Sequence, residues 1–140
     1  MITKYRTPYG TVFHSTTCKD DHPNMVTRED FDKEPFTGMT LQQPALRALR
    51  AAERTLGHIW KPEHIRVTGS IRSCEQQRGL WLSDKSRFAS PDTTLHTQGL
   101  AIDVHTGHLN DRVRKALLAH GWKQSRPDDE PWHFSFKLRA

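Results

Sequence analysis

Two segments in the C-terminal half of the chain alternate apolar and polar residues with the period of two that is typical of strands. They span residues 100–105 and 132–136. The apolar faces carry Leu100, Ile102 and Val104 in the first segment and Trp132, Phe134 and Phe136 in the second. The opposite faces carry Ala101, Asp103 and His105 in the first segment and His133 and Ser135 in the second. Antiparallel pairing of these strands would place Asp103 and His133 together on one polar face.

Two other segments repeat apolar residues with the period of an amphipathic helix. Residues 41–58 form the clearest example, and Gly57 stands where that helix would end. Residues 109–120 form the second, which Gly121 ends. The inward positions are Leu41, Leu46, Leu49, Ala52 and Leu56 in the first helix and Leu109, Val113, Leu117 and Leu118 in the second. A shorter helix is predicted over residues 74–82.

The remaining segments favour strands and loops. Residues 64–70 predict a strand, and residues 83–95 predict a loop that is either functional or a plain connector. Residues 1–40 show little periodicity apart from a hairpin over Tyr5–Phe13. We interpret them as an irregular arm that packs on the core or borders a cleft. Together the elements predict an α+β fold, with helices packed on one face of a small antiparallel sheet.

The composition fits one small folded domain. The 140 residues are expected to form a single unit, 1–140, whose core lies in residues 41–140. Hydrophobic residues make up only 34% of the chain, but four Trp and six Phe add large buried areas. The sequence therefore predicts a compact domain, which we expect to be monomeric.

The positive net charge of the chain favours negatively charged partners. A formal net charge of +5 and a pI near 9.5 suggest attraction to polyanions. The basic residues are scattered rather than clustered, so the phosphates of a bacterial wall are favoured and nucleic-acid binding is not expected. The N-terminus has no apolar signal-peptide core, and no window is apolar enough to span a membrane. We therefore expect synthesis in the cytoplasm without membrane insertion.

The cysteines give little guidance. Cys18 and Cys74 are too few and too far apart for a disulfide framework. We expect two reduced thiols, with one long-range bridge as the alternative. His14, Cys18 and His22 are spaced like metal ligands, but the sequence around them is poor helix material and does not favour a site there.

The candidate chemistry lies in and just before the two alternating segments. Asp103 stands inside an apolar strand, where a carboxylate calls for a compensating charge. A catalytic Zn²⁺ held by His96, Asp103 and His133 would supply it, leaving a position for a water whose pKa falls to about 7. Gly99 would let the chain turn between His96 and the strand. Glu130 would be a base that does not bind the metal. For each histidine alone, a structural role is the alternative.

Three ordered motifs resemble those of a known family. They are His96–Asp103 (HTQGLAID), Glu130–His133 (EPWH) and Val67–Ser73 (VTGSIRS). These motifs resemble the signatures of the zinc D-alanyl-D-alanine carboxypeptidases of the vancomycin-resistance type. That group belongs to a wider set of metallopeptidases that includes lysostaphin and the hedgehog N-terminal domain fold. Ile71 replaces the family's usual aromatic residue, and Thr94 stands where the family often has Ser, so the pocket walls differ but no ligand is lost.

The resemblance implies a zinc-dependent peptidase that acts on D-Ala-containing stem peptides of bacterial peptidoglycan at the cell wall, as a phage endolysin or virion component does. It also implies that Arg72 contacts substrate and stabilises charge at the scissile carbonyl. Ser73, Trp132 and His105 are further candidates for substrate contacts, with a solvent-facing role as the alternative for His105. Carboxypeptidase and endopeptidase activities both fit. The alternative function is a non-catalytic, zinc-containing virion or wall-binding module.

Overall fold

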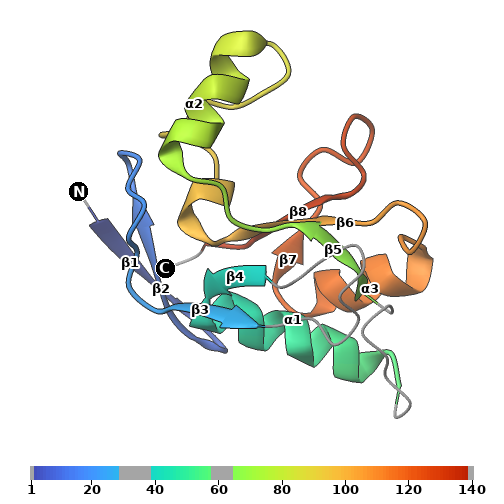
Figure 1. The fold of residues 1–140 in the computed structure, drawn as a ribbon. Coiled ribbons are helices and arrows are strands. Elements are labelled where there is room, and N and C mark those ends of the chain that lie inside the picture. The colour runs from blue at the N-terminus through green and yellow to red at the C-terminus, as the bar shows by residue number, and fades with distance from the viewer. Residues whose placement is uncertain (1, 29–38, 58–64, 139–140) are drawn as a thin grey trace.

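The computed structural model describes residues 2–28, 39–57 and 65–138, which form the predicted α+β fold (Figure 1). In chain order the elements are β1 (Ile2–Thr7), β2 (Gly10–Ser15), β3 (Met25–Arg28), β4 (Met39–Gln42), α1 (Gln43–Thr55), β5 (Val67–Gly69), α2 (Cys74–Ser83), the 3-10 turn η2 (His96–Gln98), β6 (Ala101–Val104), α3 (Asp111–Ala119), β7 (Trp122–Lys123) and β8 (His133–Phe136). Within these ranges, no helix is both long and apolar enough to cross a bilayer.

The largest sheet is antiparallel, with strand order β5-β6-β8-β7. The predicted pairing of the two alternating segments is confirmed, because Asp103 lies opposite His133 and Ile102 lies opposite Phe134. Ile102 and Phe134 are fully buried in the core. A shift of one residue would exchange the two faces, so burial of the apolar face fixes the register of the polar one. The sheet therefore holds Asp103 and His133 side by side.

The helices begin and end close to the predicted positions. In Figure 1, α1 and α3 lie on one side of this sheet and α2 lies on the other. The first predicted helix starts later than residue 41, because Leu41 pairs with Val26 in the β3–β4 ladder. The prediction that Leu118 faces inward is wrong. In α3, Val113 and Leu117 share the buried face, whereas Leu118 lies about 100° around the helix from Leu117 and is 40% exposed.

The N-terminal segment is more regular than predicted. The expected hairpin is present and longer, since β1 and β2 pair from Ile2–Ser15 to Thr7–Gly10. β3 and β4 form a second antiparallel pair, so the interpretation of an irregular arm is wrong for the part of it that the structure describes. Residues 1 and 29–38 of that arm, 58 of the predicted first helix and 64 of the predicted strand lie outside the described ranges.

Buried glutamines attach this N-terminal region to the rest of the molecule. The side chain of Gln42 accepts a hydrogen bond from the Phe13 N–H at 2.8 Å and donates to the Phe13 carbonyl at 2.6 Å. The side chain of Gln98 accepts from the Ser15 N–H at 2.7 Å. Gln42, Gln98 and Ser15 are all fully buried or nearly so. Because such bonds depend on spatial contact and not on periodicity, this attachment could not be predicted from the sequence.

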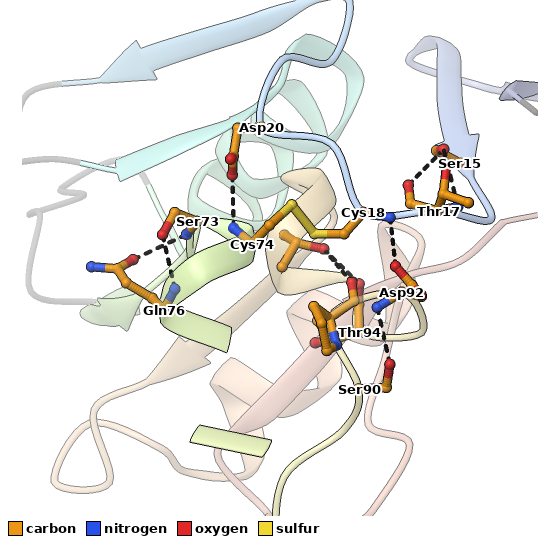
Figure 2. The surroundings of a disulfide bond; sticks show 12 residues. Ser15, Thr17, Cys18, Asp20, Ser73, Cys74, Gln76, Ser90, Asp92 and Thr94 are labelled. Atoms are coloured by element: carbon orange, nitrogen blue, oxygen red, sulfur yellow. Dashed lines mark hydrogen bonds between the residues drawn. A yellow bond between two sulfur atoms is a disulfide. The ribbon is translucent and has the colours of Figure 1, made fainter. Parts of the chain in front are cut away.

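A disulfide joins Cys18 to Cys74, which corrects the expectation of two reduced thiols. Figure 2 shows the bridge with a hydrogen bond on either side of it. The Cys74 N–H donates to the Asp20 carboxylate, and the Cys18 N–H donates to the Asp92 carboxylate, both at 2.7 Å. Cysteines this far apart in sequence carry no pairing signal of their own. The bridge ties the N-terminal region to the first turn of α2.

Replacing Cys18 and Cys74 together with serine is expected to lower the free energy of unfolding by roughly 2–4 kcal/mol, because the bridge closes a long loop in the unfolded chain. Denaturant unfolding with and without a reductant measures this difference. Reductant should destabilise the wild type and leave the double variant unchanged. Equal stability of both proteins under oxidising conditions would show that the bridge does not form.

Candidate metal centre

Hydrogen bonds to its ring and to its backbone hold His96 in one orientation. It opens η2 and is almost completely buried. Its Nδ1 lies 2.8 Å from the Ser70 carbonyl, which can only accept, so Nδ1 carries the proton and Nε2 offers a lone pair. The Thr94 hydroxyl accepts from the His96 N–H at 3.3 Å. An imidazole whose second nitrogen donates to a carbonyl is the usual arrangement of a metal-binding histidine.

Gly99 makes the turn from η2 into β6. Its φ of 67° lies in the left-handed region, which favours glycine. A Cβ at this position would also lie 2.7 Å from the side chain of Met25 and 3.0 Å from the backbone nitrogen of Gln42. The prediction of a tight turn here is confirmed, and the turn brings His96 back over the strand that carries Asp103.

Three side chains from these elements converge. His96 Nε2 lies 3.2 Å from His133 Nδ1 and 3.4 Å from Asp103 Oδ1, and His133 Nδ1 lies 3.2 Å from the same carboxylate oxygen. Each residue offers one ligand atom, and the three atoms lie within 4.8 Å of one another. Among the residues that the structure describes, this is the one group of at least three His, Cys, Asp or Glu side chains that could hold a metal ion.

The electrostatics of the group favour an anionic Asp103. Burial by itself would raise the pKa of the Asp103 carboxyl, but its hydrogen bonds with the His133 and His96 rings lower the pKa by more. The pKa of this carboxyl therefore lies well below its usual range. The carboxylate is ionised at neutral pH and able to bind the cation that its place in an apolar strand was expected to require.

Arg72 lies beside the cluster and is fixed at three points. Its backbone N–H donates to the His96 carbonyl at 3.1 Å. Its guanidinium donates to the Asp103 carboxylate at 3.4 Å and to the Gln77 side-chain carbonyl at 3.1 Å. Gln77 is 1% exposed, and its amide also donates to the Ala89 carbonyl at 2.8 Å. The sequence did not predict that Gln77 positions Arg72, because a single glutamine in a short helix does not indicate which residues it contacts.

A cavity of about 370 Å³ opens over the three ligand atoms. Glu130 lines it together with His96, Asp103 and His133. The Glu130 carbonyl accepts from the His133 N–H at 3.0 Å, so a tight turn places this carboxylate close to the start of β8. Its Oε2 lies 3.9 Å from Nη1 of Arg126, which is itself paired with Asp129. The cavity therefore combines three potential metal ligands with a separate carboxylate and with Arg72.

The other predicted substrate contacts lie in different places. Trp132 lines the cavity and is half-buried, so the expectation that it faces the core is wrong; β8 begins one residue later. Ser73 caps α2, where its hydroxyl accepts from the Gln76 N–H at 3.0 Å. His105 accepts from the Gly107 N–H at 3.0 Å and packs against His108. Among the described residues, the lining of the cavity includes neither Ser73 nor His105.

The alternative ligand spacing near the N-terminus does not form a site in the described part of the chain. Cys18 is oxidised to a disulfide and offers no thiolate. His22 is buried, neither of its ring nitrogens has a hydrogen-bond partner, and burial is the main cause that lowers its pKa. A neutral histidine is the form that burial favours.

Comparison with known proteins supports the fold. No family model matches the sequence, and no curated protein matches it. The arrangement of helices and small antiparallel sheets is similar to that of a solved D,D-dipeptidase. This solved structure is the vancomycin-resistance D,D-dipeptidase VanXYg, in complex with a phosphinate analogue of D-Ala-D-Ala. The TM-score is 0.58 at 16% identity. The match covers 89% of this chain and 61% of that one, so the chain spans less than two thirds of its length.

Proposed function

We propose that the protein is a zinc-dependent peptidase that hydrolyses D-Ala-containing stem peptides of bacterial peptidoglycan. The observation that carries the proposal is the spacing of the ligand atoms of His96, Asp103 and His133, which lie 3.2 to 3.4 Å apart. Two ligands bound to one zinc ion at about 2.1 Å with tetrahedral angles lie roughly 3.4 Å apart. Two imidazoles and one carboxylate also form a ligand set that catalytic zinc sites use.

The residues around the ligands suit hydrolysis. A bound zinc ion supplies Lewis-acid polarisation of a carbonyl oxygen and promotes the deprotonation of water. Glu130 would accept the proton of the water that attacks the carbonyl carbon, and would deliver it to the amine nitrogen as the carbon–nitrogen bond breaks. Arg72 would donate to a substrate carboxylate or to the developing oxyanion, in a fork geometry that lysine cannot reproduce. Gln77 would hold Arg72 in position for this.

Two observations support the choice of substrate. The fold neighbour was solved with an analogue of D-Ala-D-Ala, and the cavity walls carry the arginines Arg72, Arg87 and Arg126, which suit a substrate with carboxylates. The disulfide between Cys18 and Cys74 supports action outside the reducing cytoplasm, since such bonds persist in oxidising environments. We therefore place the activity at the bacterial wall.

The test combines metal analysis with product analysis. Protein purified without chelator should contain one equivalent of zinc, and mass spectrometry should detect trimmed or cut stem peptides after incubation with purified peptidoglycan. Removing the metal with a chelator should abolish cleavage, and added Zn²⁺ should restore it. A protein that binds no metal, or that cleaves equally well after complete metal removal, would refute the proposal.

A further inference from the structure

A second hollow adjoins the catalytic cavity. It has a volume of about 660 Å³ and lies between β5 with the turn that follows it and the outer face of α2. Its walls include Thr68, Ile71, Gly79 and Leu80. In Figure 1, α2 rises from the chain just after β5, on the side of the sheet away from α1 and α3. We refer to this hollow as the β5–α2 groove.

The groove and the cavity meet at the metal centre. Arg72 and Asp103 line both of them, while Glu130 and Trp132 line the cavity. The carboxylate of Asp103 is therefore reached from two sides. A peptide with its scissile bond in the cavity, over the three ligand atoms, could extend past Arg72 and Asp103 into the groove.

Two glycines keep the groove open. Gly79 stands inside α2, where glycine is less favourable than alanine. A Cβ at Gly79 would meet no atom of the protein within 4 Å, so the packing of the chain does not require glycine there. A Cβ at Gly69 would lie 3.4 Å from Asp103 Oδ2, so a larger side chain would project over the ligand from the groove side. Both glycines leave room for a molecule that is not part of the chain.

The groove has the chemistry of a peptide-binding surface. Ile71, in the turn after β5, is 36% exposed and adds apolar lining opposite Leu80 of α2, while Glu75 adds a carboxylate. β5 is an outer strand of its sheet as far as the chain is described, and a peptide added beside an outer strand gains main-chain hydrogen bonds. The groove thus suits an extended chain with a small apolar side chain against Ile71 and Leu80 and a cationic group near Glu75.

We propose that the β5–α2 groove binds the peptide chain on one side of the scissile bond, so that the protein cleaves extended peptides in preference to dipeptides. This inference rests on the proposed peptidase function. It distinguishes the protein from an enzyme restricted to dipeptides, which needs one closed pocket and has no use for a second binding surface beyond the reacting bond.

Substitutions at Gly79 test the groove without touching the metal centre. Gly79→Trp would fill the groove, and Gly79→Ala is its matched control, since alanine adds only a methyl group in open space. Two synthetic stem peptides are compared, one that ends next to the scissile bond on both sides and one extended on both sides. We expect the wild type and Gly79→Ala to cleave the extended peptide with a kcat/KM about tenfold higher than the short one, a difference of about 1.4 kcal/mol.

In Gly79→Trp, the advantage of the extended peptide should disappear while cleavage of the short peptide is unchanged. The unchanged short-peptide activity also shows that the variant is folded. Ile71→Asp, on the opposite wall, should produce the same selective loss. A wild type that cleaves both peptides equally, or a Gly79→Trp variant that retains the preference, would overturn the groove assignment and leave the peptidase proposal standing. A wild type that cleaves neither peptide would overturn both.

Discussion

His96→Ala is expected to lose the bound zinc ion and to cleave peptidoglycan peptides at least about a thousandfold more slowly than the wild type. The ion supplies several kcal/mol of transition-state stabilisation, and each 1.4 kcal/mol is worth about tenfold in rate. His96 is the most deeply buried of the three ligands, and its orientation is set by the Ser70 carbonyl. Elemental analysis of the purified variant and a peptide-cleavage assay measure the two losses.

The matched control is His108→Ala. This variant removes an imidazole that packs against His105 and is not one of the three ligands. It should keep one equivalent of zinc and the wild-type rate. If His96→Ala also kept its zinc, the ion would be bound elsewhere, and the assignment of the metal centre to His96, Asp103 and His133 would be wrong.

The part of the site that the sequence predicted is the part built on a sheet. Period-two alternation specifies which residues share a face, and burial of the apolar face then fixes the register. For this reason the pairing of Asp103 with His133 could be expected before the structure was known. The convergence of His96 followed from a glycine that permits a turn, which is again a local property of the chain.

The features that the sequence did not predict depend on contacts between distant segments. The β1–β2 hairpin is attached through the buried side chains of Gln42 and Gln98, whose hydrogen bonds leave no periodic trace. The bridge from Cys18 to Cys74 required knowledge that the two residues are neighbours in space. The inward prediction for Leu118 failed because this residue lies about 100° around the helix from Leu117, beyond the face that Val113 and Leu117 share.

The same limit applies to the supports around the ligands. Gln77 joins Arg72 to the Ala89 carbonyl, and neither contact is visible in a sequence pattern. Gly79 is a further example, since an isolated glycine in a helix predicts only a weaker helix. Only the structure shows that Gly79 lines a groove. Motifs therefore located the chemistry, while the fold was needed to show what positions Arg72 and what lies next to the cavity.

Glu130→Gln is expected to lower kcat by about a hundredfold to ten-thousandfold while leaving one equivalent of zinc bound. Glutamine keeps the size of the side chain and removes its ability to accept a proton at neutral pH. Glu130 lines the cavity but is not one of the three clustered ligands, so metal content and rate should separate in this variant. Steady-state kinetics with a stem peptide, together with elemental analysis, measures both.

Asp129→Asn is the control, because it removes the same charge from the adjacent position, where the exposed carboxylate pairs with Arg126. It should retain both the bound zinc and the wild-type rate.

The Glu130 result also distinguishes the proposed enzyme from a non-catalytic wall-binding module. A module would hold zinc and bind the wall with or without Glu130, and neither protein would cut a peptide. An enzyme that uses another base would cut equally well in both, whereas a loss of rate at full zinc occupancy is expected only if Glu130 moves the proton.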